Sequence, residues 1–202
     1  MSTISMKLFM EAIKYYTELG YKLIDVPQCV DFDVSQHTKP KGIAEQFHAG
    51  MKVYVASAEQ SFIQLHKEGN IKKGKYLAVT PCYRTEAVLD EIHYSMFLKA
   101  ELIVIGKEES YTVMTDALRF FNEYVSVTYT PTDESEDSFD IIHNWTNTEL
   151  GSYGVRKMLD GTPYTYGTAL ADPRLSYCIE NNSKEAGEEL LKMLFSTKAL
   201  KE

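Results

Sequence analysis

Two short segments near the middle of the chain carry side chains that could hold a nucleotide. If residues 83–101 form a strand–loop–strand hairpin, alternation places Arg84 and Glu86 on one face of its first strand. Phe97 and Glu101 then share a face of the returning strand. An arginine can hold phosphate or carboxylate oxygens by two parallel hydrogen bonds, and an aromatic ring can stack a purine. Taken alone, this segment favours a surface Arg–Glu pair beside a core phenylalanine over a nucleotide site.

A second candidate lies where the C-terminal part of the chain is expected to become helical. Asp172 is a good N-cap and Pro173 a good first helical residue, so Arg174 would lie in the first turn. There its charge adds to the free N–H groups and the positive end of the helix dipole, which makes an anion site. The alternative is a surface arginine on an amphipathic helix.

A third candidate is an acidic residue followed by a hydroxyl. Glu149 and Ser152 are three residues apart, and Gly151 and Gly154 beside them would allow close backbone approach. Magnesium typically takes one or two carboxylates and keeps phosphates and waters as its other ligands. The pattern therefore indicates a Mg²⁺ site at an ATP phosphate.

The elements that position these residues can be predicted from hydrophobic periodicity and from turn residues. Helices are expected over 6–19, 58–68, 111–124 and from 172 onward, with a loop over 31–50. Strands are expected over 21–26, 52–57, 76–84, 96–105, 126–130, 139–145, 149–155 and 164–168. Consecutive strands with short connections favour an α+β fold, with a mainly antiparallel sheet of six or seven strands flanked by helices and the hairpin at its centre.

Composition limits the class of protein. The chain has 202 residues, so we expect a single domain over 1–202. Its net charge of −8 argues against nucleic-acid binding by this chain alone, but not against a nucleotide in a cleft. Cys29, Cys82 and Cys178 form neither a zinc pattern nor a disulfide framework. With no signal peptide or membrane span in the pattern, we expect a cytoplasmic protein.

The three candidate segments together resemble motifs of class II aminoacyl-tRNA synthetases. YRTE followed by HYSMF is similar to motif 2, and GTALADPRL is similar to motif 3. The stretches TPCYRTEA, YVASAEQSF, FLKAEL and YGTALADPRLSYCIEN each resemble a stretch of the seryl-tRNA synthetase group, in the same order. YKLIDVPQCV resembles motif 1, whose proline lies in the family's dimer interface. The resemblance covers roughly residues 5–182, so we expect a synthetase-like catalytic domain without an anticodon-binding domain.

The resemblance implies how ATP would be held. Arg84 would contact the α-phosphate and the activated carboxylate, while Glu86 and His93 would orient the nucleotide. Phe97 would stack the adenine. Arg174 would hold the γ-phosphate end and cover the other face of the adenine ring. The implied catalytic residues are Arg84, Glu86 and Arg174.

The resemblance also implies the metal and amino-acid sites. Glu149 and Ser152 would bind Mg²⁺ and the phosphates. Glu59 lies where related enzymes recognise the substrate's α-amino group, and Thr168 would belong to the same substrate site. The implied reaction is ATP-dependent activation of an amino acid, in which the site supplies positioning and charge stabilisation.

Two positions depart from the seryl pattern. The motif 2 loop, AVLDEI, is short and acidic, whereas tRNA-charging relatives commonly have a longer loop that reaches the acceptor stem. Tyr166 stands where the seryl pattern has Asn, which leaves the amino acid undetermined. The final acceptor could be tRNA or another molecule, and the charge does not favour tRNA.

Two other readings remain beside amino-acid activation by a minimal synthetase-like ligase. One is a non-catalytic paralogue that serves as a regulatory or dimerising module. The other is an amide ligase that resembles asparagine synthetase A. We expect a homodimer, because the segment from the first helix to Pro27 resembles motif 1 and a chain this small is not expected to cover the apolar face of its first helix alone.

Overall fold

A seven-stranded sheet lies at the middle of the fold. The computed structural model describes residues 4–39, 47–132 and 137–182. The strands of the sheet are β1 (Lys22–Leu23), β5 (Gly74–Tyr83), β6 (Met96–Ile105), β7 (Val127–Pro131), β8 (Phe139–His143), β9 (Glu149–Lys157) and β10 (Pro163–Asp172). They follow the order β1-β5-β6-β10-β9-β8-β7, and among the described strands only β1 and β5 run parallel. The predicted α+β fold is confirmed.

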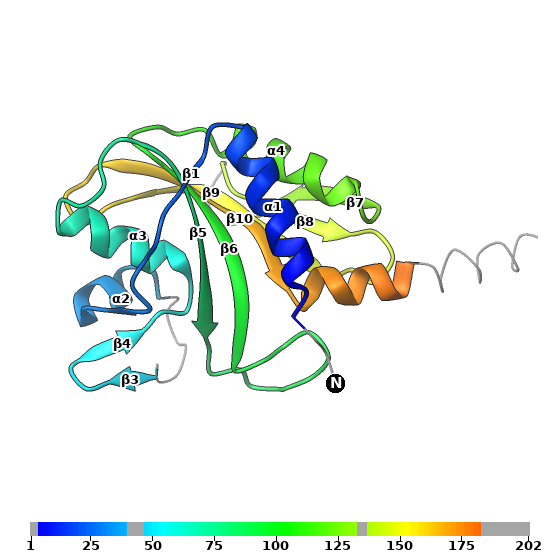
Figure 1. The fold of residues 1–202 in the computed structure, drawn as a ribbon, viewed down its shortest axis with the longest axis horizontal. Helices are drawn as coiled ribbons and strands as arrows, with labels where there is room; N and C mark the ends of the chain where they lie inside the picture. Colours follow the sequence, from blue (N-terminus) through cyan, green and yellow to red (C-terminus); the bar gives the residue numbers. More distant parts are fainter. Residues whose placement is uncertain (1–3, 40–46, 133–136, 183–202) are drawn as a thin grey trace, which may run out of the picture.

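Helices and a small second sheet cover the two faces of the large sheet (Figure 1). One face carries α1 (Met6–Glu18) and α4 (Ser110–Asn122). The other carries α2 (Phe32–Thr38), α3 (Ala58–Lys67) and a three-stranded sheet of β2 (Cys29–Val30), β3 (His48–Ala49) and β4 (Lys52–Tyr54). A further helix begins at residue 174. Within the described ranges, no helix has both the length and the apolar character needed to cross a membrane.

Each face of the sheet has its own hydrophobic core because side chains alternate along the strands. Along β6, Ala100, Leu102 and Val104 pack toward α1 and α4. Ile103 and Ile105 belong instead to the core beneath α3. Residues nearer the start of β6 on this second face are therefore left for the site described below.

The β5–β6 hairpin is regular but is not at the centre of the sheet. The two strands pair from Gly74 opposite Ile105 to Tyr83 opposite Met96. The central strand is β10, which lies between β6 and β9. The expectation of a central hairpin is wrong because β10 is twice the expected length and pairs with β6 along most of it.

The segment 31–50 contains more structure than its polar sequence suggested. Helix α2 occupies much of it, and β3 follows, whereas 40–46 lies outside the described residues. Only Val34 of α2 joins the core, so the helix has almost no hydrophobic periodicity to detect. The strand expected over 21–26 is reduced to β1, which pairs with β5 at only two positions.

Glycines end two helices as the sequence indicates. Gly20 has a φ of 87° after α1, and Gly69 has a φ of 75° after α3. Left-handed conformations of this kind are favourable for glycine, which lacks a Cβ. Both predicted helix ends are confirmed.

The three cysteines are free thiols. Cys82 and Cys178 are buried, and Cys29 is half-buried. Burial raises the pKa of the Cys82 thiol to about 12, so this side chain stays protonated and behaves as a small apolar group. The three thiols are not paired with one another, in agreement with the spacing of the cysteines in the sequence.

Candidate active site

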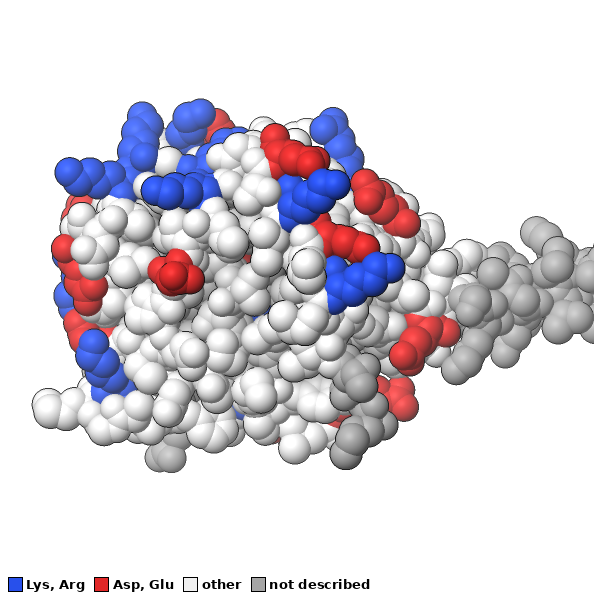
Figure 2. Space-filling model, viewed as in Figure 1, with Lys and Arg blue, Asp and Glu red and all other residues white. Residues whose placement is uncertain are grey.

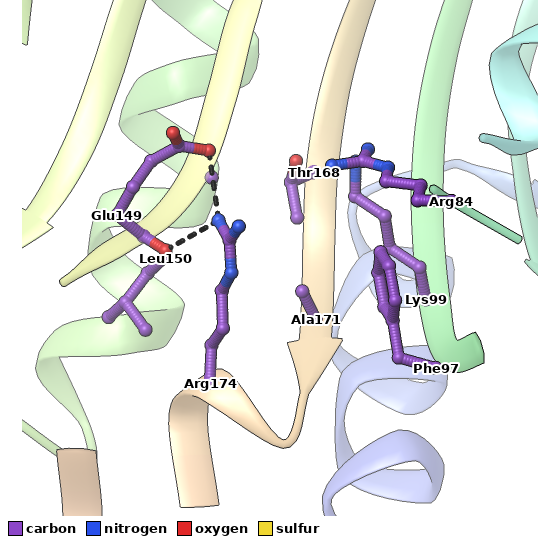
Figure 3. A pocket seen from close by; sticks show the side chains of 9 residues that line it. Arg84, Phe97, Lys99, Glu149, Leu150, Thr168, Ala171 and Arg174 are labelled. Atoms are coloured by element: carbon purple, nitrogen blue, oxygen red, sulfur yellow. Dashed lines mark hydrogen bonds and ion pairs between the residues drawn. The ribbon is translucent and has the colours of Figure 1, made fainter. Parts of the chain in front are cut away.

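A cleft opens where β5 and β10 end and where β6 and β9 begin, on the face of the sheet that carries α3. It holds about 240 Å³, part of it open to solvent. Figure 3 shows its side chains converging from these strands and from the helix that follows β10. The cleft is lined by Arg84, Phe97, Lys99, Glu149, Leu150, Gly151, Thr168, Ala171 and Arg174. Five residues predicted from the sequence therefore meet in one place.

Arg84 and Phe97 form one wall of the cleft. Arg84 directly follows the end of β5, where its backbone N–H donates to the Ser95 carbonyl oxygen at 3.0 Å, and its side chain lines the cleft together with Phe97. The Arg84 guanidinium lies 5.2 Å from the centre of the Phe97 ring. Arg84 also donates from Nε to the Ala56 carbonyl oxygen at 3.2 Å. Two contacts thus fix the guanidinium, and no carboxylate of the described residues forms an ion pair with it.

Arg174 lies on the other side of β10 from Arg84 (Figure 3). It is the first residue of the last helix, whose first turn closes when Tyr177 donates its backbone N–H to the Pro173 carbonyl at 2.9 Å. The N-cap position is thus Pro173, one residue later than predicted, and Asp172 ends β10. The prediction that Arg174 lies in the first helical turn is confirmed.

The Arg174 guanidinium is held by Glu149. Its Nη1 donates to Glu149 Oε1 at 3.1 Å and to the Glu149 carbonyl oxygen at 3.0 Å. A cation at the start of a helix opposes the helix dipole, so an anionic partner is needed to stabilise it. Glu149 supplies that anion, and a phosphate could take its place because it offers more acceptor oxygens.

Asp172 joins the starts of two helices. Its Oδ2 accepts from the backbone N–H of Ser5, the N-cap of α1, at 2.6 Å. Its Oδ1 accepts from the Ser176 hydroxyl at 2.6 Å and from the Ser176 N–H at 3.4 Å. The carboxylate is fully buried and therefore connects α1 directly to the helix that carries Arg174.

Glu149 and Ser152 face the same side of the sheet although they are an odd number of residues apart. Their partners on β8 are Ile142 and Asp140, because the pairing shifts by one residue between Ser152 and Glu149. Partners in an antiparallel pair point the same way, so the shift directs the acid and the hydroxyl to one face, where Glu149 lines the cleft and Ser152 lies outside its lining. The described residues contain no group of three His, Cys, Asp or Glu side chains able to hold a metal. A Mg²⁺ ion at Glu149 and Ser152 would therefore need phosphate oxygens as well.

Lys99 and Glu101 continue the cleft along β6. Lys99 lines the cleft and donates from Nζ to Glu101 Oε1 at 2.8 Å. Glu101 also accepts from the Ser57 hydroxyl at 2.7 Å and from the Ala58 N–H at the start of α3. Burial acts to raise the pKa of Glu101, but the Lys99 charge and these hydrogen bonds outweigh it and lower the pKa. The sequence prediction included Glu101 but missed Lys99, although alternation from Phe97 would have found it.

Glu59 lies away from the lining of the cleft, at the interface between α3 and the sheet. Its carboxylate accepts from Arg156 Nη1 at 2.9 and 3.1 Å and from the Tyr164 hydroxyl at 2.7 Å. The Glu59 side chain is 9% exposed and that of Arg156 34%. In this arrangement the predicted amino-group acceptor is already engaged by two side chains of the protein.

Glu86 and His93 lie on the connection between β5 and β6, because β5 ends at Tyr83. Neither lines the cleft. The His93 ring contacts Asp90 through Nδ1 at 2.8 Å, and the His93 N–H donates to the same carboxylate at 2.8 Å. Arg84 and Glu86 were expected to share a face of a strand. That expectation is wrong, because both residues lie beyond the end of β5.

Solved structures with the same arrangement are aminoacyl-tRNA synthetases. A pyrrolysyl-tRNA synthetase from Desulfitobacterium hafniense has a TM-score of 0.69 at 14% identity, over 87% of this chain and 69% of that one. The cytoplasmic serine-tRNA ligase of Naegleria fowleri, solved with AMP, has a TM-score of 0.68 at 16% identity. Seryl-tRNA synthetase of Pyrococcus horikoshii, solved with ATP, has a TM-score of 0.69 at 17% identity.

These likenesses cover most of this chain but only about half of each seryl enzyme. Each of the two seryl enzymes is matched over 87% of this chain, which spans 53% and 50% of their own lengths. No protein-family model and no curated protein matches the sequence. At identities this low, the structural likeness shows the fold alone. The chain therefore has the fold of the class II aminoacyl-tRNA synthetase core.

Proposed function

We propose that the protein activates an amino acid with ATP, forming an aminoacyl-adenylate and releasing pyrophosphate. The observation that carries the proposal is the convergence of Arg84, Phe97, Thr168, Glu149 and Arg174 on one cleft from four separate parts of the chain. Solved neighbours in complex with AMP and ATP support a nucleotide site in this fold. The two arginines can bind phosphate oxygens, the aromatic ring can stack the adenine, and the carboxylate can bind Mg²⁺ at the phosphates.

The two arginines suggest the direction in which the nucleotide would lie. Phe97 offers an aromatic face to the adenine, and the Arg84 guanidinium beside it would meet the α-phosphate. Arg174, on the other side of β10, would meet the distal phosphates. ATP bound in this way is bent around β10, and its α-phosphorus lies over Thr168.

The reaction needs no nucleophilic side chain. An oxygen of the amino acid carboxylate would form a bond to the α-phosphorus as the bond to the bridging oxygen breaks and pyrophosphate leaves. Negative charge grows on the α-phosphoryl oxygens during this step, and Arg84 would stabilise it without moving, since Ala56 and Phe97 already hold its guanidinium.

Glu149 and Ser152 would hold Mg²⁺ at the phosphates. The divalent ion would neutralise part of the phosphate charge when it is bound. In the ligand-free arrangement the Glu149 carboxylate is engaged by Arg174. A distal phosphate that binds Arg174 would release this carboxylate for the metal. We therefore expect the nucleotide to raise the affinity for Mg²⁺, and Mg²⁺ to raise the affinity for the nucleotide.

The remaining predicted residues are assigned to the edges of the site. Thr168 lines the cleft and would contact the amino acid. Glu86 and His93 would orient the nucleotide from the β5–β6 connection. Glu59 would act on the amino acid through Arg156 and Tyr164, which hold its carboxylate.

An exchange assay tests the proposal. We expect the protein to incorporate labelled pyrophosphate into ATP only when one or a few of the twenty amino acids are added. Nucleotide binding without exchange by any amino acid would indicate the non-catalytic paralogue. AMP formation that requires both an acidic amino acid and ammonia would indicate the amide ligase.

We also propose a homodimer formed through α1 and the neighbouring edge of the sheet. Met6 and Met10 of α1 are 59% and 69% exposed, and Leu23 of the short edge strand β1 is 46% exposed. Much of the centre and lower part of the face in Figure 2 carries no charged side chain, and Lys and Arg gather toward its upper edge. Sedimentation at micromolar concentration should give twice the chain mass, and Met10→Glu should shift it toward the monomer. A wild-type monomer at all concentrations would contradict the dimer.

A further inference from the structure

The outer end of the Tyr166 ring lies close over Gly154 of the neighbouring strand. Tyr166 is the pairing partner of Gly154, which belongs to β9. A Cβ added to Gly154 would lie 2.6 Å from the Tyr166 hydroxyl oxygen and 2.8 Å from two of its ring carbons. Contacts this short do not occur, so glycine is needed at 154 for the phenol ring to occupy this position.

A chain of polar contacts holds the Tyr166 ring in place. The Arg156 guanidinium lies 4.2 Å from the ring centre, a cation–π contact. Arg156 is in turn bound by both carboxylate oxygens of Glu59, and the Tyr164 hydroxyl donates to the same carboxylate. Glu59 belongs to α3, so the ring is anchored to a helix as well as to the sheet.

The Tyr166 ring is the neighbour of the cleft on the same face of β10. Tyr166 and Thr168 are two residues apart on β10, so both point to the face that carries the cleft, and Thr168 lines it. Gly154 stands in the same relation to Ser152 on β9. A ligand group that extends from Thr168 along the sheet, away from Arg174, therefore meets the Tyr166 ring.

We propose that Tyr166 is a specificity-determining residue that restricts the substrate to an amino acid with a small side chain, of the size of glycine, alanine or serine. The proposal rests on the proposed function. With the α-phosphate at Arg84 and the distal phosphates at Arg174, the amino acid occupies the inner end of the cleft near Thr168. Its side chain then points toward a ring that cannot swing aside without breaking its contacts with Arg156 and Gly154.

The test compares pyrophosphate exchange with glycine, alanine, serine, valine, leucine and phenylalanine. The wild-type protein should use the first three. Tyr166→Ala should increase exchange with valine or leucine relative to alanine by roughly tenfold to a hundredfold, because each added methylene that fits a pocket changes discrimination by about this amount. Tyr166→Phe keeps the ring over Gly154 and should keep the wild-type ranking. Tyr129→Ala, an exposed tyrosine on edge strand β7, is the matched control and should change nothing.

Two results would overturn the inference. One is a wild-type preference for leucine or phenylalanine. The other is a Tyr166→Ala variant that melts near the wild-type temperature and still ranks the six amino acids as the wild type does. If Tyr166→Ala does not fold, Tyr166→Val serves as the variant. If wild-type protein binds ATP in calorimetry but no amino acid supports exchange, the proposed activity fails separately. The size limit is then measured from the change in melting temperature that each of the six amino acids causes. If Tyr166→Ala shows the same changes as the wild type, the role of Tyr166 is refuted.

Discussion

Arg84→Ala should slow amino-acid-dependent pyrophosphate exchange by a factor on the order of 10²–10³. The guanidinium is fixed by the Ala56 carbonyl and the Phe97 ring before any ligand binds, so its stabilisation of the α-phosphoryl charge needs no reorganisation. ATP and AMP should both bind more weakly, since both carry the α-phosphate. Exchange kinetics and calorimetric titration with the two nucleotides measure these effects.

Arg174→Ala is the variant to set beside it. Losing one charge-assisted contact costs about 1.5–3 kcal/mol, roughly ten- to a hundredfold in affinity. That loss should fall on ATP and spare AMP, which lacks distal phosphates. Phe97→Ala should weaken both nucleotides by about 1–3 kcal/mol through the lost stacking. An equal loss of ATP and AMP in Arg174→Ala would refute the orientation assigned to the nucleotide.

Arg156→Met should lower the free energy of unfolding by about 3 kcal/mol, because it leaves the Glu59 carboxylate buried without its cation. The Glu59 side chain is 9% exposed, so water cannot replace the lost partner fully. Urea titration followed by circular dichroism measures the change. The loss in the free energy of unfolding should be smaller than for a fully buried pair, because the Arg156 side chain is 34% exposed.

The double variant separates the ion pair from simple packing. Glu59→Leu combined with Arg156→Met removes both charges and should recover part of the stability lost in either single variant. Strict additivity of the two losses would show that the charges do not interact. Lys67→Met provides the control, since Lys67 pairs with Asp31 and Asp33 at the surface and its loss should change the stability little.

Local patterns in the sequence were sufficient for several parts of the site. Alternation along β6 places Phe97 and Glu101 on one face, as predicted. The start of the last helix puts Arg174 in its first turn, and the exact cap differs by one residue. Both features depend on neighbours within a few positions, which is the range over which strand and helix geometry is fixed by the residues themselves.

Long-range pairings were not accessible in this way. Glu59 and Arg156 lie far apart in the chain, and nothing in the residues around either one indicates the other. The register shift that unites Glu149 with Ser152 depends on how β9 pairs with β8, because strict alternation alone would place them on opposite faces. Helix α2 was missed since its stability comes from packing of Val34 and not from its own periodicity.

Asp172 connects the start of α1 with the start of the helix that carries Arg174. Its carboxylate binds the N-cap of α1 through one oxygen and the first turn of the Arg174 helix through the other. If two subunits meet through α1, a triphosphate that displaces the Arg174 helix in one subunit also displaces the surface presented to its partner. Linkage then requires that ATP changes the dimerisation constant by the same factor by which dimerisation changes ATP affinity, so the two sites would bind cooperatively.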